Sequence, residues 1–221
     1  MTRRLRISWP DDHPFERRPA PIRILAASDE ADRSLDDERN RASLGRVDLV
    51  VGCGDLSPEQ IGFLGDALGA PVVFVKGNHD RGGAWRNPAH VPTPARGIDA
   101  RSLAPIPLLA LPWPGREADA ARRSESQGWA QVLLAAGPWL LRRPGPSIVV
   151  SHAPPLGAND NPADPYHRGF AAYRFLLDRV RPQLWLHGHA ALAEASSWHC
   201  REGATTLVNV TGSVLVEIEP R

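Results

Sequence analysis

Polar residues that can bind metal ions or transfer protons follow several short apolar runs in this sequence. The clearest example is Gly77-Asn78-His79-Asp80, which comes directly after the apolar run 72–75. Four more such residues follow other apolar runs: Asp29, Asp55, His152 and His189. In open α/β sheets, ligands bind in the crevice outside the carboxyl ends of the strands. The repeated pattern therefore predicts that these side chains meet in one site.

These residues offer a mixed set of donor atoms. Asp29 and Asp55 supply carboxylate oxygens, Asn78 an amide oxygen, and two histidines imidazole nitrogens. Such a set favours a divalent manganese, iron or zinc ion over calcium. A carboxylate shared by two ions would hold them roughly 3.5–4 Å apart for phosphoryl displacement, and an ion also lowers the pKa of a bound water. We therefore expect one or two divalent ions per chain and hydrolysis of a phosphate ester.

The residues beside Asn78 suggest the proton chemistry. His79 is expected to donate a proton to a leaving oxygen or to stabilise charge on the phosphate. Asp80 is expected to orient the His79 ring, as carboxylates often do for working histidines. Taken alone, Gly-Asn-His-Asp also fits a loop whose polar side chains bond their own backbone. The ordered recurrence of donor residues at successive strand ends favours the metal site.

Short apolar runs alternate with helix-like segments, which predicts parallel strands joined by crossover helices. Strands are expected at 22–27, 47–53, 72–75, 147–150 and 184–186, and a helix should open at Ser57-Pro58 and stop near Gly69. The proline-interleaved run 103–111 predicts an edge strand or a bulged pair. The runs 205–210 and 213–218 predict a final hairpin. Residues 1–20 are expected to form a polar arm ahead of a single domain at 21–221.

Composition narrows the class of protein. The 221 residues carry a formal net charge of +1, which argues against a broad nucleic-acid interface. The sequence has no apolar run of about 18 residues, so we expect no membrane span. Its two cysteines make no disulfide framework. We expect a cytoplasmic protein with a small phosphorylated substrate; its oligomeric state is left open.

Five segments, in this order, resemble the motifs of the calcineurin-like metallophosphoesterase superfamily. They are Asp29-Glu30-Ala31, Gly54-Asp55, Gly77-Asn78-His79-Asp80, Ser151-His152 and Gly188-His189-Ala190-Ala191. The order and spacing of these motifs agree over about residues 22–218. The loop that follows Pro154-Pro155 resembles the corresponding loop in a small single-domain branch of the superfamily. The resemblance implies an α/β fold of the αββα type, a sandwich of two sheets with helices on both outer faces.

The resemblance also implies a role for each matching position. Asp55 would bridge two metals, and Asn78, His152 and His189 would complete the second metal site. Asp29 would bind the first metal. His79 would be the acid or phosphate-binding histidine, with Asp80 supporting it.

Two positions depart from the motifs on the side of the first metal. Ala31 and Ala191 stand where the superfamily has metal-binding histidines, and alanine has no donor atom. Three outcomes are open. The protein uses one metal, or a nearby acid replaces the lost ligands (Glu30, Asp32 or Glu194), or it binds its ligand without catalysis. We expect weaker phosphoesterase activity than a complete two-metal site would give, with a binding or regulatory protein as the alternative.

Two further histidines need separate interpretation. His167 lies in the loop 156–169 and is either a substrate contact or a solvent-exposed loop residue. His187 is separated from His189 by Gly188, where the chain can bend and turn the two side chains apart, so we assign it a structural role.

Overall fold

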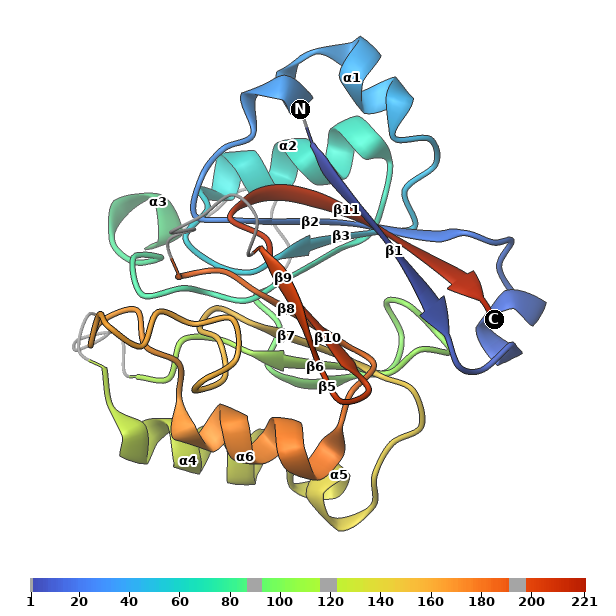
Figure 1. Ribbon diagram of the computed structural model, residues 1–221. Coiled ribbons are helices and arrows are strands. Elements are labelled where there is room, and N and C mark those ends of the chain that lie inside the picture. Colours follow the sequence, from blue (N-terminus) through green and yellow to red (C-terminus); the bar gives the residue numbers. More distant parts are fainter. Residues whose placement is uncertain (1, 87–92, 116–122, 191–197) are drawn as a thin grey trace.

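Two β-sheets stack face to face in the computed structural model, with helices on both outer faces (Figure 1). The structure describes residues 2–86, 93–115, 123–190 and 198–221. The first sheet has the strand order β1-β11-β2-β3-β4, and the second has the order β5-β6-β7-β8-β10-β9. This arrangement confirms the αββα sandwich that the sequence predicted.

The strands are short, and most of them are buried. The first sheet contains β1 (Arg3–Trp9), β2 (Ile22–Ser28), β3 (Leu49–Gly52), β4 (Val72–Phe74) and β11 (Gly212–Pro220). The second contains β5 (Gly97–Asp99), β6 (Leu108–Leu111), β7 (Ile148–Ser151), β8 (Leu184–His187), β9 (His199–Glu202) and β10 (Thr205–Asn209). Strands β2, β3 and β4 run parallel, as do β6, β7, β8 and β10. Parallel strands deliver their carboxyl ends to one edge of each sheet, where the predicted site residues follow.

The helices form the two outer layers. Helices α1 (Glu38–Ser43) and α2 (Pro58–Leu68) cover the first sheet, and α4 (Glu125–Ala135), α5 (Gly137–Leu141) and α6 (Ala171–Val180) cover the second (Figure 1). The described residues also form short helical turns: α3 (Gly83–Arg86) and 3-10 turns at His13–Glu16 and Arg33–Asp36.

Helix α2 has the boundaries that its sequence predicts. The Ser57 side chain accepts a hydrogen bond from the backbone N–H of Gln60, and Pro58 occupies the first turn. Gly69 ends the helix in the left-handed conformation, at φ 58°. The local capping signals were therefore sufficient to place this helix.

Three apolar layers hold the four structural layers together. The central layer lies between the sheets and includes Ile24, Val51 and Val150. Because successive strand side chains point to opposite faces, Leu25 instead packs beneath α2, and Trp185 packs against α4 and α6. Because each sheet is buried on both faces, its strands have defined positions, and so do the starting points of the loops that follow them.

The N-terminal segment differs from the expected polar arm. Residues 3–9 form β1, which pairs in parallel with β11 and places Ile7 and Trp9 in the central apolar layer. Arg3, Arg4 and Arg6 make the segment look polar, although a strand with one buried face carries polar residues on its other face. Strand β1 therefore belongs to the first sheet.

The predicted final hairpin is wrong. Strand β10 pairs with β8 and β9 in the second sheet, whereas β11 pairs with β1 and β2 in the first. Between them the chain crosses from one sheet to the other at Thr211-Gly212, where Gly212 has a φ of 79°. Each strand buries apolar side chains in its own sheet, and the alternating sequence could not reveal this separation.

The strand within 103–111 is not an edge strand. Strand β6 begins at Leu108, after Pro105 and Pro107, so no proline removes a hydrogen bond from its ladder. Strand β5 forms the edge and leaves β6 between β5 and β7.

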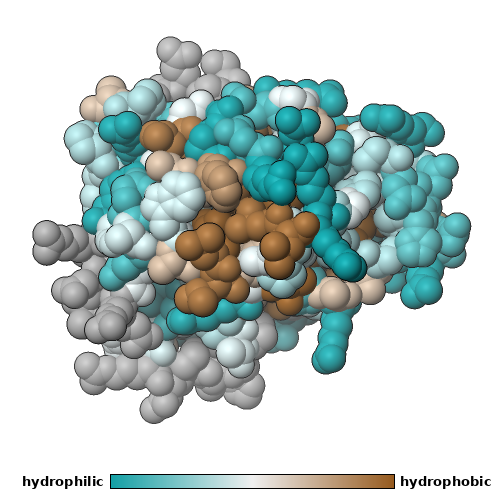
Figure 2. Space-filling model, turned by 90° about the horizontal axis from the view of Figure 1, so that it is seen from below, coloured by the Kyte–Doolittle hydropathy of each residue, from teal (hydrophilic) through white to brown (hydrophobic). Residues whose placement is uncertain are grey.

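Apolar side chains gather on the outer face of the helices that cover the second sheet (Figure 2). The most exposed are Leu134 and Leu141, at 84% and 86% of their accessible area. Within the described residues, no helix has the length and apolar character needed to cross a membrane.

A buried carboxylate on β11 gives a test of the fold's dependence on pH. Glu217 is 3% exposed and accepts hydrogen bonds from Nε of Arg23 at 3.0 Å and Nε of Arg6 at 3.1 Å. Burial alone would raise the pKa of Glu217, but the two guanidinium groups outweigh it and hold this pKa below its usual value. The resulting stabilisation is complete above the unfolded-state pKa of about 4.3 and is lost as the pH falls through the lower folded-state pKa.

We expect Glu217→Gln to lower the free energy of unfolding by about 1–3 kcal/mol at pH 7, because charged hydrogen bonds are lost. The difference from wild type should shrink toward zero at acidic pH, as the pH falls through the lowered folded-state pKa of Glu217. Urea denaturation at both pH values measures it. Glu219→Gln, on the same strand at a half-exposed position, is the control. An equal loss at both pH values would contradict the ionic origin.

Candidate metal centre

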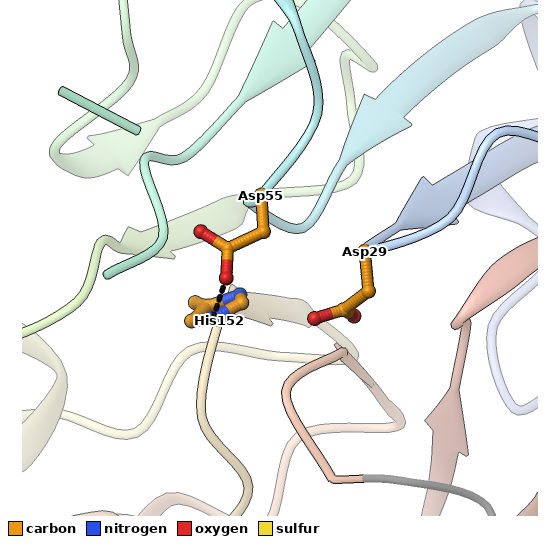
Figure 3. A group of neighbouring side chains, drawn as sticks. All are labelled: Asp29, Asp55 and His152. Carbon is orange, nitrogen blue, oxygen red and sulfur yellow. Dashed lines mark ion pairs between the residues drawn. The ribbon is translucent and has the colours of Figure 1, made fainter. Parts of the chain in front are cut away.

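Three of the predicted ligands converge between the two sheets. Asp29 follows β2, Asp55 follows β3 and His152 follows β7. One potential ligand atom from each lies within 4.8 Å of those of the other two. Figure 3 shows their side chains directed toward one another, with an ion pair of 3.2 Å between His152 Nε2 and Asp55 Oδ2. The parallel strands thus bring together residues that are far apart in the sequence.

Unusual backbone conformations aim several of these side chains. Asp29, Asp55 and His189 have φ values of 59°, 55° and 64°. Such positive values are uncommon for residues other than glycine, and cluster at functional sites where the surrounding structure enforces them. The strain is therefore concentrated on the predicted ligands.

The hydrogen bonds of His152 fix which ring nitrogen faces the site. Its Nδ1 lies 2.8 Å from the carbonyl oxygen of Cys53, which can only accept a hydrogen bond. Nδ1 therefore carries a proton, while Nε2 faces the Asn78 amide oxygen at 2.8 Å and the Asp55 carboxylate at 3.2 Å. Two oxygen acceptors and this ring nitrogen need a cation among them, either a proton on Nε2 or a metal ion that replaces it. The donor set therefore fits a bound metal ion, with the Cys53 carbonyl orienting its histidine from behind.

The electrostatics of the cluster favour positive charge. His152 is fully buried, and burial alone would lower its pKa. The facing carboxylates of Asp55 and Asp29 outweigh burial and raise the pKa of His152 to about 9. A cation placed among these groups would therefore be stabilised, whether it is a proton or a metal ion.

Asp29 is held by hydrogen bonds from three sides. Its Oδ2 accepts from the hydroxyls of Ser28 and Thr211 and from the backbone N–H of His189, the last at 3.0 Å. A Cβ on Gly188 would lie 2.4 Å from this carboxylate oxygen and 1.8 Å from the Ser28 hydroxyl. Glycine is therefore required at position 188 for the last motif to approach the first.

His189 lies beside the cluster but is not part of the three-residue group. Its ring centroid is 5.0 Å from that of His152, and its Nε2 donates to the carbonyl oxygen of Tyr166 at 3.0 Å. Burial, followed by the nearby His152, lowers the pKa of His189 to about 3. The ring is thus neutral, the form in which histidine binds metals.

Asp80 does not support His79 in the way that the sequence suggested. Asp80 Oδ2 accepts hydrogen bonds from the backbone N–H groups of Asp55 and Gly77, both at 2.8 Å. The carboxylate therefore joins the two ligand loops instead of orienting the imidazole. His79 is exposed at the rim of the site, and its backbone N–H donates to Asp55 Oδ1 at 2.8 Å.

Loop 156–169 contributes residues next to the predicted ligands. His167 is half-buried, and its ring centroid lies 5.1 Å from that of His189. The Tyr166 hydroxyl accepts from the Asn78 amide nitrogen at 2.5 Å. Tyr166 is not among the residues that the sequence pattern predicts for the site, and its position beside His167 is the local signal that points to it. His187 is buried and bonds Asn159 through Nε2 at 2.9 Å, which agrees with a structural role.

The side of the site around Asp29 has few further donors among the described residues. Ala31 is exposed and has no donor atom, and Glu30 is also exposed. Both Asp32 carboxylate oxygens are already engaged, by Ser34 on one side and by Thr2 and Ser213 on the other. Asp32 therefore caps the 3-10 turn at Arg33–Asp36 and is not free to replace a lost ligand. Ala191 and Glu194 lie outside the described residues.

Comparisons with known proteins agree with this architecture. The model of the calcineurin-like phosphoesterase family matches residues 25–191. One solved structure has a TM-score of 0.61 at 14% identity and covers 89% of this chain and 95% of its own. The phosphopantetheinyl hydrolase PptH of Mycobacterium tuberculosis has a TM-score of 0.54 at 14% identity, covering 91% of this chain and 97% of its own. TT1561 of Thermus thermophilus has a TM-score of 0.47 at 15% identity, covering 87% and 90%.

No curated protein matches the sequence. The family model spans most of the chain, from β2 to the residues after β8, and includes the three converging ligands. The chain belongs to the calcineurin-like phosphoesterase family.

Proposed function

We propose that this protein is a metal-dependent phosphoesterase that hydrolyses a small phosphomonoester or phosphodiester. The observation that carries the proposal is the convergence of His152 Nε2, the Asn78 amide oxygen and the Asp55 carboxylate at one point. Family membership supports the same chemistry. Manganese, iron and zinc all suit this mixture of nitrogen and oxygen donors.

In this proposal Asp55, Asn78, His152 and His189 hold the cation. Asp29 faces the same space from β2, where the described residues offer a second ion only the two aspartates. A bound divalent ion would polarise the phosphate and lower the pKa of a water molecule. The protein's own contribution is to hold four donors rigidly through the two sheets and through Asp80, which joins the loops of Asp55 and Asn78.

Two histidines are positioned to contact the substrate. His79 is exposed at the rim, one residue from Asn78, where it can protonate the leaving oxygen as the phosphorus–oxygen bond breaks. His167 Nδ1 lies 2.5 Å from Asp164 Oδ2, which turns Nε2 away from that carboxylate and toward other partners. We assign His79 the role of acid and His167 that of a phosphate contact.

The missing ligands around Asp29 determine the turnover rate that we expect. Ala31 stands in place of a histidine, and Asp32 is engaged elsewhere. The proposed site therefore lacks the second metal ion that would help to stabilise both the attacking and the leaving oxygen. We therefore propose modest turnover. The alternative function favoured by Ala31 is a protein on the same fold that binds metal and phosphate without hydrolysis.

We expect manganese-loaded protein to hydrolyse generic aryl phosphate esters, and Asn78→Ala to lower the rate by about 10–100-fold, the size of effect seen when groups around a metal are removed. Steady-state release of the aryl alcohol measures this. Asn40→Ala, on the exposed helix α1, is the matched control and should retain the wild-type rate.

Equal rates for wild type and Asn78→Ala would contradict a catalytic metal site. No hydrolysis by wild type, combined with saturable binding of manganese and inorganic phosphate, would establish the binding protein instead.

A further inference from the structure

The loop from Leu156 to Gly169 is anchored beside the metal centre. Pro155 and Phe170 form an isolated β-bridge at its base, and the N–H of Leu156 donates to the Phe170 carbonyl at 3.1 Å. Asp160 Oδ2 also accepts from the N–H of Gly169 at 2.8 Å. These contacts close the ends of the loop, so its interior residues have a defined position.

Within this loop, Tyr166 contacts Asn78. The Asn78 side-chain NH₂ donates to the Tyr166 hydroxyl at 2.5 Å, while the Asn78 amide oxygen faces His152 Nε2 at 2.8 Å. Asn78 is fully buried, so its NH₂ group has no access to bulk water. The hydroxyl therefore accepts a donor that would otherwise be left unpaired, and it holds the amide oxygen toward the cation position.

The same residue contacts His189 through its main chain. The carbonyl oxygen of Tyr166 accepts from His189 Nε2 at 3.0 Å, and the two rings lie 5.3 Å apart. A carbonyl can only accept, so the proton of the neutral imidazole resides on Nε2. The lone pair on Nδ1 is then available to a metal ion, and the hydrogen bond fixes the tautomer as contacts behind metal ligands usually do.

Asp164 keeps Tyr166 in this position. Its Oδ1 accepts from the backbone N–H of Tyr166 at 2.9 Å, and its Oδ2 contacts His167 Nδ1 at 2.5 Å. One carboxylate thus sets the main chain at Tyr166 and the ring of its neighbour.

We propose that Tyr166 is a positioning residue for the metal centre, orienting Asn78 through its hydroxyl and His189 through its carbonyl. Because both contacts arise from one loop residue, metal binding and the order of the loop are thermodynamically coupled, and each favours the other. This inference rests on the metal site of the proposed function and does not require turnover.

The test compares the chain's two tyrosines. Tyr166→Phe removes the hydroxyl that contacts Asn78, and Tyr173→Phe makes the same chemical change at a buried hydroxyl that bonds Gln131 and the Pro112 carbonyl instead. Chelator-stripped protein is titrated with manganese chloride by calorimetry. We expect about 10–100-fold weaker manganese binding for Tyr166→Phe and wild-type affinity for Tyr173→Phe.

Amide hydrogen exchange supplies a second measurement. A purely structural role of Tyr166 would not change how manganese affects the exchange rate. Manganese should slow amide exchange in peptides from 156–169 of the wild type, and this protection should be smaller in Tyr166→Phe. Equal manganese affinity in Tyr166→Phe and wild type would overturn the inference even if the enzyme is active. Wild type that binds manganese but hydrolyses no ester would refute the proposed function alone, and wild type that binds no manganese would refute both.

Discussion

Replacing His152 with alanine is expected to remove tight metal binding and to lower the rate of ester hydrolysis by about 10³-fold, which corresponds to roughly 4 kcal/mol of transition-state stabilisation. His152 Nε2 is the atom on which the Asp55 carboxylate and the Asn78 amide oxygen converge. Without it, these two oxygen donors lose the nitrogen that completes their set. Metal content per chain, by elemental analysis of the purified protein, and aryl phosphate hydrolysis give the two measurements.

His13→Ala, at an exposed position in the turn His13–Glu16, is the matched control and should retain both metal and activity. Because His152 is fully buried, thermal unfolding must show that the variant is folded at the assay temperature. His152→Asn, which keeps a polar group in the same space, offers a second variant if alanine fails that check. Folded variants with undiminished metal content would show that the cation lies elsewhere.

Replacing Trp9 with alanine is expected to lower the free energy of unfolding by about 3–5 kcal/mol, the usual cost of removing a large aromatic side chain from a core. Trp9 is 1% exposed and packs in the apolar layer between the two sheets. It is the last residue of strand β1, which pairs with β11 from Arg3 to Trp9. Guanidinium chloride denaturation followed by circular dichroism measures the change.

Trp129→Ala on helix α4 is the control, because this tryptophan is 37% exposed and its removal should cost clearly less. A loss of under about 1 kcal/mol for Trp9→Ala would be in the range of surface substitutions. That result would mean that residues 3–9 behave as a peripheral arm, as expected from the sequence.

Local signals in the sequence were sufficient for several elements. Ser57, Pro58 and Gly69 mark the ends of α2, and the structure has them in those roles. Short apolar runs marked most of the parallel strands. These features could be predicted because capping and strand burial depend on residues that are close together in the chain.

Pairing between distant segments could not be predicted in the same way. The runs around Thr211-Gly212 have the pattern of a hairpin, yet β10 and β11 belong to different sheets. The segment 3–9 pairs with β11 at the other end of the sequence. An alternating pattern states that a strand has a buried face, but it does not name the sheet to which the strand belongs.

The sequence by itself determined the chemistry: which donor residues follow the strands, the family whose motifs they match, and the position at which Ala31 interrupts them. It could do so because residue type and spacing suffice to define a donor set at the carboxyl ends of parallel strands. Only the tertiary structure decided how those donors are held. Asp80 bonds two backbone groups instead of His79, and Tyr166 meets Asn78 across a separation of 88 residues. Hydrogen bonds of this kind depend on where separate loops meet, and that is set by the packing of the two sheets.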